Sequence, residues 1–171
     1  SNIISGLFVL SEGTIKIGDF ISIDEVSGTV DQVNLLSVRI ITLDNQVVRI
    51  PNSSIINSSL TNYSFLNQRR FGFNVVISYD SDMNLALETL RSAASYCPTV
   101  LTNPPPLVWF DGFENSGIKM SAAVWFKSSD LIATKNAMYI AIKKVFDEAG
   151  IEISYNRVVL ETGKNADEKY V

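Results

Sequence analysis

The chain has 171 residues, of which 46% are hydrophobic and 19% charged, a composition typical of globular proteins and sufficient for one large domain or two small ones. Its formal net charge of -4 at pH 7 argues against a general nucleic-acid-binding protein, which usually carries a basic face. The lack of histidine and the single cysteine, Cys97, exclude an intrachain disulfide, the usual zinc-ligand sets and the Ser-His or Cys-His catalytic systems.

The first ten residues, SNIISGLFVL, are apolar and uncharged. They are shorter than the roughly 20 apolar residues of a membrane-spanning helix, and they lack the basic region of a signal peptide. We interpret residues 1–12 as the truncated end of a longer helix, the alternative being an amphipathic helix packed on the domain. Gly6 lies inside this helix, where alanine would stabilise the helix by roughly 1 kcal/mol more than glycine. A glycine at this position therefore indicates close helix packing or a hinge.

Residues 13–67 are predicted to form an all-β domain. Short β runs follow one another at tight spacing, namely DFISID, SGTVDQVNL, SVRIITLD and QVVRIP. We assign Gly18, Gly28 and the pair Asp44-Asn45 to turns. Four or five short strands without a long helix are typical of a small barrel or sandwich.

The last of these runs ends at Pro51-Asn52. Proline removes a backbone donor and fixes φ, and asparagine favours turns, so the pair predicts a corner. The stretch NSSIINSSLTNYS that follows is rich in Asn and Ser but spaces Ile and Leu regularly. We predict a helical turn and then a short edge strand there, and we group Asn62 with the turn and interface residues.

Residues 68–160 have longer, better separated elements. RRFGFNVVISY alternates as a strand, and DSDMNLALETLRSAASY places apolar residues on one helical face. Two strands, LVWFDGF and IKMSAAVWF, precede a second helix over residues 131–149 that ends at Gly150, and ISYNRVVLE is the last predicted strand. The order β-α-β-β-α-β indicates a ferredoxin-like α+β domain. Residues 161–171 are predicted to be a charged, disordered tail.

Several conspicuous side chains have structural explanations. Asp80 or Ser81 is predicted to cap the first helix of this domain. We prefer this explanation to a metal site formed by Asp80 and Asp82, because no convergent carboxylates are apparent nearby. Cys97 is interpreted as a small buried residue near a helix end. Trp109 and Trp125 are predicted to fill the core, with a subunit contact as the alternative.

The order of these motifs resembles the small-conductance mechanosensitive ion channel (MscS) family. The resemblance rests on IKIGDFISI, SGTVDQVNLLSVRIITLDNQVVRIPNSSI, TNYS, YDSD and DEAGIEISY, and it extends from the first residues to about Tyr155. It implies a β domain resembling the Sm fold followed by a ferredoxin-like domain. The junction SEGTIK departs from the family's basic pattern because it contains Glu12 and only Lys16.

The resemblance also implies a function and a setting. Members form rings of seven subunits in the inner membrane, and the two domains would form a hollow cytoplasmic vestibule through which ions and small solutes pass on hypo-osmotic shock. Membrane attachment would come from an N-terminal sector absent from this sequence. Gly6 would then be the hinge of the pore-lining helix, and Gly18, Gly28, Pro51, Asn52 and Asn62 would serve turns and interfaces.

Two other kinds of function stay open at this stage. An Sm-like domain can bind RNA, although the acidic balance disfavours this and we predict no nucleic-acid partner. A ring-forming regulatory domain could bind a small ligand, with Arg69, Arg70 or Asp111 as contacts. We predict no enzymatic activity, no cofactor and no metal.

Overall fold

The computed structural model describes residues 2–154, which divide into two compact units. The first unit contains the chain up to Arg70 together with Trp125–Lys135, and the second contains Phe71–Val124 together with the chain from Asn136 onward. The first is organised on a β-sheet and the second on a sheet covered by helices. This arrangement confirms the predicted fold class, a β domain followed by an α+β domain.

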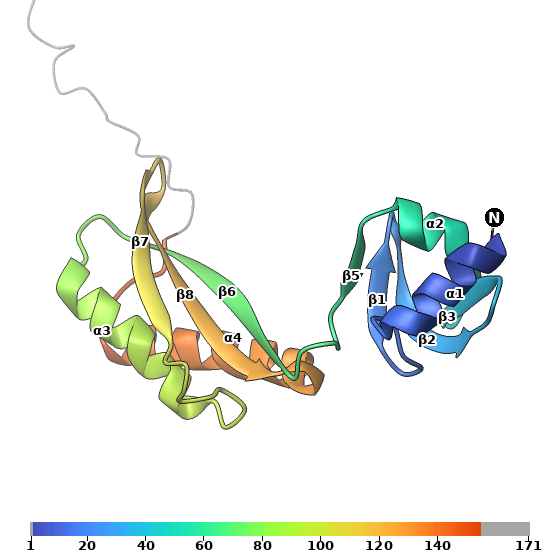
Figure 1. Cartoon of the computed structure of the whole chain (residues 1–171). Helices are drawn as coiled ribbons and strands as arrows, with labels where there is room; N and C mark the ends of the chain where they lie inside the picture. The colour runs from blue at the N-terminus through green and yellow to red at the C-terminus, as the bar shows by residue number, and fades with distance from the viewer. Residues whose placement is uncertain (1, 155–171) are drawn as a thin grey trace, which may run out of the picture. The chain divides into compact units, whose positions relative to one another are not determined.

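Five antiparallel strands form the sheet of the first unit, in the order β4-β3-β2-β1-β5 (Figure 1). Side chains alternate along them, so that Ile21, Val30, Val38 and Ile40 are buried in one core while their neighbours face outward. The strands are β1 (Phe20–Ile23), β2 (Val26–Val33), β3 (Ser37–Ile41), β4 (Val47–Pro51) and β5 (Leu60–Asn62).

The turns of this sheet agree with the sequence at two positions and disagree at one. Gly18 lies in a turn with φ +93°, and Asn45 has φ +61° in the turn between β3 and β4. Gly28, however, lies inside β2 opposite Ile21, and the turn from β1 to β2 is made at Asp24, whose φ is +50°. Gly28 is required for another reason, because a Cβ there would lie 2.5 Å from the Ile41 carbonyl oxygen.

Two short helices pack together beside this sheet, α1 (Asn2–Glu12) and α2 (Asn52–Asn57) (Figure 1). Helix α2 begins immediately after Pro51, and the chain then enters β5 at the sheet edge. The corner, the helical turn and the edge strand therefore follow the predicted order.

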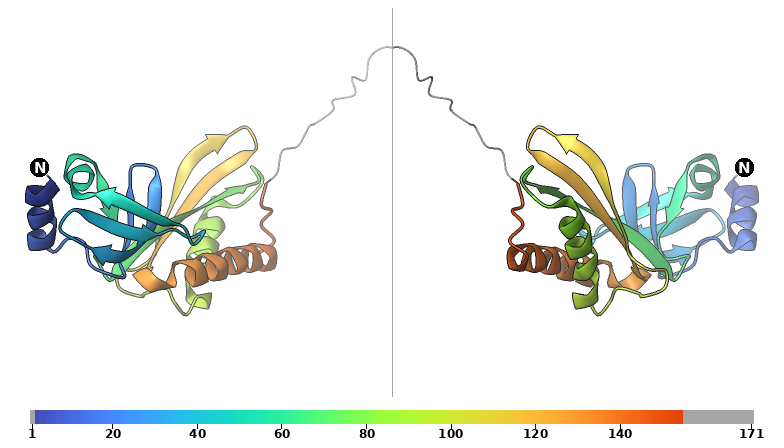
Figure 2. Two further views of the ribbon diagram at one scale, coloured as in Figure 1. Left: turned by 90° about the vertical axis from the view of Figure 1, so that its right-hand side faces the viewer. Right: turned by 90° about the vertical axis from the view of Figure 1, so that its left-hand side faces the viewer.

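The second unit is built on the sheet β6-β8-β7, with helices α3 and α4 on one face (Figure 2). An isolated antiparallel bridge from Ile153 to Ile77 places the last described residues, 152–154, beside β6, in the strand order of a ferredoxin-like fold. The elements that follow β5 are β6 (Gln68–Ile77), α3 (Met83–Ala93), η1 (Ala94–Tyr96), β7 (Leu107–Glu114), β8 (Gly117–Lys127), η2 (Ser128–Asp130) and α4 (Leu131–Glu148). Of these, η2 and the adjoining ends of β6, β8 and α4 belong to the first unit. The remainder of the predicted last strand and the tail 161–171 lie outside the described residues.

The core of the second unit contains Phe73, Met138 and Phe146 but not Trp109. Trp109 is 41% exposed, contrary to the core prediction, because it lies on the outward-facing side of β7. Cys97 is buried as expected, and desolvation raises the pKa of its thiol.

The N-terminus of α3 is capped by a different residue from those predicted. The Asp82 carboxylate accepts a hydrogen bond from the Leu85 backbone N–H at 3.0 Å, whereas Asp80 and Ser81 precede the cap in a turn. Asp82 therefore satisfies one of the free N–H groups of the first helical turn.

We expect Asp82→Ala to lower the free energy of unfolding by about 1 kcal/mol, because this cap is lost. Urea denaturation followed by circular dichroism measures the change. The matched control is Asp80→Ala, for which we expect less than about 0.5 kcal/mol. Equal costs for the two variants would show that the capping assignment is wrong.

Candidate functional site

Helix α1 has one narrow buried side and a broad exposed side. Gly6 and Val9, one helical turn apart, are buried, and Gly13 with φ +62° ends the helix. The exposed side carries large apolar residues that are 49–59% accessible: Ile3, Ile4, Leu7, Phe8 and Leu10. Such a surface on an 11-residue helix is typical of a segment that meets another apolar partner.

Gly6 lets the backbone of α1 approach the turn between β2 and β3 directly. A Cβ at this position would lie 1.7 Å from the Leu35 carbonyl oxygen and 2.9 Å from Asn52 Nδ2. No side chain fits at such distances unless the helix or the turn moves. Of the two roles that the sequence offered for Gly6, the geometry favours close packing, and the hinge stays a prediction.

Asn52 holds the turn that Gly6 touches. It is fully buried, and its Nδ2 donates hydrogen bonds to the carbonyl oxygens of Asn34 and Leu35, both at 2.9 Å. Its backbone N–H donates to the Leu36 carbonyl oxygen at 3.0 Å, which satisfies a free donor at the start of α2. The corner at Pro51-Asn52 thus fixes the β2–β3 turn beneath α1.

The Asn52 Oδ1 atom has no hydrogen-bond partner within the described part of the chain. A buried acceptor without a donor costs about 1–3 kcal/mol. The packed arrangement of α1, α2 and the turn therefore carries an energetic penalty at its centre, which the two Nδ2 hydrogen bonds and the apolar contacts offset.

Asn62 is a second polar clamp in the same unit. Its Nδ2 donates to the Thr14 carbonyl oxygen and to Asp19 Oδ2, both at 2.8 Å, and its Oδ1 accepts from the Ser64 N–H at 3.0 Å. The turn that contains Gly18 is closed by the Asp19 N–H, which donates to the Lys16 carbonyl oxygen at 3.0 Å, and the Gly18 N–H joins the turn to β2 by donating to the Val30 carbonyl oxygen at 2.8 Å. Asn62 therefore fastens the segment after α1 to the end of β5.

The predicted ligand contacts do not form one cluster. The Arg69 guanidinium lies 4.7 Å from the centre of the Tyr63 ring, and Arg70, the next residue of β6, is exposed. Successive residues of a strand project to opposite faces, so the two arginines do not converge. Their role as contacts for a solute stays a prediction.

Asp111 is engaged within its own sheet. Its carboxylate accepts from the Trp109 indole N–H at 2.9 Å and contacts the Ser121 hydroxyl, which also lies 2.7 Å from Asn74 Oδ1. Among residues 2–154, no group of three or more His, Cys, Asp or Glu side chains is placed to hold a metal ion. None of the described helices combines the length and hydropathy needed to cross a membrane.

Sequence reasoning missed the turn that receives α1. Leu35 and Leu36 are exposed apolar residues between two strands, where a tight turn usually carries polar residues. That anomaly was the available signal. The decisive groups, the carbonyl oxygens of Asn34 and Leu35, are main-chain atoms that no residue pattern specifies.

Comparison with known proteins gives two matching family models. Residues 1–65 match the mechanosensitive ion channel beta-domain, and residues 71–153 match the C-terminal region of the mechanosensitive ion channel MscS. An uncharacterized MscS family protein of Archaeoglobus fulgidus is 37% identical over 160 residues, covering 94% of this chain and 56% of that protein. The large-conductance mechanosensitive channel MscMJLR of Methanocaldococcus jannaschii is 27% identical over 167 residues, covering 91% of this chain and 45% of that protein.

The fold also matches solved structures. Helicobacter pylori MscS in its closed state superposes with a TM-score of 0.86 at 24% identity, covering 96% of this chain and 65% of that chain. Arabidopsis thaliana MSL1 gives a TM-score of 0.79 at 19% identity, covering 91% and 56%. The chain spans about half the length of several curated relatives that it matches.

We expect Asn52→Val to lower the free energy of unfolding of the first unit by about 2 kcal/mol, because the carbonyl groups of Asn34 and Leu35 lose their donor. Removal of the unpaired Oδ1 offsets part of this cost. Urea denaturation measures the loss. Asn57→Val, at the exposed end of the same helix, serves as the control and should change stability by less than about 0.5 kcal/mol. Equal stability of Asn52→Val and the parent would contradict a structural role for the Nδ2 hydrogen bonds.

Proposed function

The chain belongs to the MscS family of mechanosensitive ion channels, and from this membership we propose that it is the cytoplasmic vestibule region of a tension-gated channel that releases solutes on hypo-osmotic shock. In this proposal, a membrane sector precedes α1 in a longer polypeptide. The two units described above would form the wall of the vestibule.

The observation that carries the proposal is the two-sided character of α1. One narrow side contacts the β domain at backbone distance through Gly6, and the rest of the helix surface exposes five large apolar side chains. A helix that leads from a membrane pore into a β domain needs both properties, since it must pack on the β domain and must also contact apolar neighbours toward the membrane. The position of α1 is thereby tied to the β2–β3 turn.

The gating argument is one of population shift. Membrane tension favours the conformation with the larger in-plane area. The larger the difference in area between the two states, the more a given tension shifts the population toward the open state. A vestibule ring would hold the subunits in register and limit which solutes reach the pore. Tight packing of α1 on the β domain would transmit displacement of the pore helix to that ring.

The decisive test uses the full-length gene product. We expect it to restore survival after hypo-osmotic shock when expressed in a bacterial strain that lacks its own mechanosensitive channels. Patch-clamp recording of the same cells should show channels that open under applied suction. Normal expression in the membrane without tension-activated current would overturn the proposed function.

Assembly is a separate prediction. The edge strand β7 exposes Leu107, Trp109 and Phe113, and an exposed apolar edge is a common site of subunit association. A closed head-to-tail ring would cover such edges in every subunit. This surface is where we place the contact between neighbouring copies.

We expect light scattering of the purified chain to give about seven times the 18.9 kDa mass of one chain. Trp109→Ser should reduce that mass because an apolar contact is lost, whereas Tyr96→Ser, which removes an exposed aromatic residue that lies outside the β-sheet, should not. A monomeric parent chain at high concentration would contradict ring formation by this region.

A further prediction concerns Gly6 in the full-length channel. Gly6→Ala introduces a methyl group where only 1.7 Å separates the Cβ position from the Leu35 carbonyl oxygen, so α1 cannot keep its packing on the β domain. We expect slower or reduced desensitisation under sustained tension, with nearly unchanged conductance, because the proposed constriction lies elsewhere. Patch-clamp recording at held pressure provides the measurement.

Ser11→Ala is the matched control for that variant. Ser11 lies on the same helix, is exposed, and donates its hydroxyl hydrogen bond only to the Phe8 carbonyl oxygen one turn earlier. We expect it to desensitise like the parent. If Gly6→Ala desensitised like the parent channel, Gly6 would have no role in desensitisation, and the family membership would be unaffected.

A further inference from the structure

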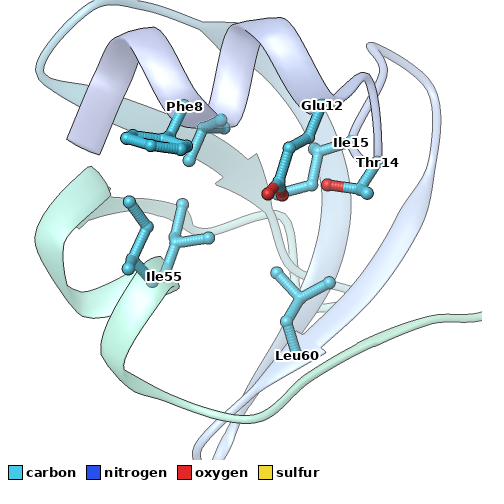
Figure 3. A pocket seen from close by; sticks show the side chains of 8 residues that line it. Phe8, Glu12, Thr14, Ile15, Ile55 and Leu60 are labelled. Carbon is cyan, nitrogen blue, oxygen red and sulfur yellow. The ribbon is translucent and has the colours of Figure 1, made fainter. Parts of the chain in front are cut away.

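An apolar groove of about 500 Å³ lies between α1 and α2 in the first unit (Figure 3). Its volume falls within the range of small-molecule binding sites, which is roughly 300–1,000 Å³. The groove is open on one side. It is separate from the Gly6 contact, although α1 contributes to both.

The walls of the groove are hydrocarbon and aromatic. Phe8 of α1 faces Ile55 of α2 across the groove, and Leu60 of β5 closes the far side (Figure 3). The remaining apolar lining residues are Val9, Ile15 and Ile56. An alkyl chain or a flat apolar group lying here would remove these surfaces from water, which is favourable.

One end of the groove is polar and acidic. The Glu12 carboxylate and the Thr14 hydroxyl lie close together at that end (Figure 3). No ion pair found among residues 2–154 includes Glu12, and none of the lining residues is basic. The site thus offers oxygen acceptors and negative charge to whatever enters it.

We propose that this groove binds a free cationic amphiphile, namely a small molecule with a protonated amine and an apolar tail. The tail would lie between Phe8 and Ile55, and the ammonium group would donate hydrogen bonds to the Glu12 carboxylate and the Thr14 hydroxyl. This binding is a property of the first unit and does not depend on the proposed channel function.

Charge complementarity selects this occupant over two others. A fatty acid or an alkyl sulfate would bring its anionic group against the Glu12 carboxylate, which is unfavourable. A neighbouring copy could insert its own α1, but that helix, Asn2–Glu12, contains no lysine or arginine to pair with Glu12. An amine with an alkyl chain satisfies both ends of the groove.

Isothermal titration calorimetry of the chain at low ionic strength tests the proposal, with each ligand below its micelle concentration. The probes are decylammonium, decanol and decyl sulfate, which share a chain length and differ in charge. We expect one decylammonium per chain, bound about threefold to fivefold more tightly than decanol, the effect of an exposed ion pair. Decyl sulfate should bind more weakly than decanol.

Two variants test the two ends of the groove. Glu12→Gln should bring decylammonium and decanol to the same affinity, whereas Glu25→Gln, which removes an exposed carboxylate from the β1–β2 turn, should keep the preference. Ile56→Ser should lower the affinity of both decylammonium and decanol. Ile17→Ser, at an exposed apolar residue outside the groove, should leave both unchanged.

Four results would overturn the proposal. Decyl sulfate could bind as tightly as decylammonium, or Glu25→Gln could abolish the preference as fully as Glu12→Gln, which would indicate a general charge effect. Binding of many molecules per chain would indicate detergent-like adsorption. Light scattering of the same samples covers the other occupant: a smaller assembly for Ile56→Ser, with unchanged ligand affinity, would make the groove a contact between copies.

Discussion

The contact between the α1 backbone and the Leu35 carbonyl oxygen is the constraint on which the first unit depends. Only a residue without a Cβ allows a helix to approach a turn so closely, and Gly6 supplies it. The turn is held in place from the other side by the buried Asn52 amide, which donates to the Asn34 and Leu35 carbonyl groups. A helix, a turn and a corner far apart in the sequence thus share one small volume.

This arrangement explains why a strand must stop at Pro51. Proline ends the ladder of β4, and the next residue then turns its side chain into the interior instead of continuing the alternation of the strand. The same chain segment forms α2, which supplies one wall of the groove beside α1. Anchoring of the apolar helix and formation of the groove are therefore consequences of one corner in the chain.

Much of the fold could be predicted because its signals are local. Alternating apolar residues indicate β3, the asparagine at position 45 indicates a turn, and Gly150 indicates the end of α4. In the structure, Asn45 and Gly150 both have the positive φ that these residue types tolerate. The errors arose where the cause is distant in sequence. Gly28 is required by the Ile41 carbonyl oxygen of another strand, and Trp109 is exposed because β7 presents that side chain away from the helices. The groove at Glu12 likewise exists only after α1 and α2 are brought together.

Gly6 is the only glycine in α1, and this has a consequence for how the helix can move. Sliding the helix along its axis by one turn, in either direction, would bring a residue with a Cβ against the Leu35 carbonyl oxygen, where no side chain fits. Small graded shifts of register are therefore blocked by steric exclusion. The helix packs on the β2–β3 turn in a single register and must move away from the turn before it can change register. We therefore expect its movement to be a two-state transition and not a continuous slide.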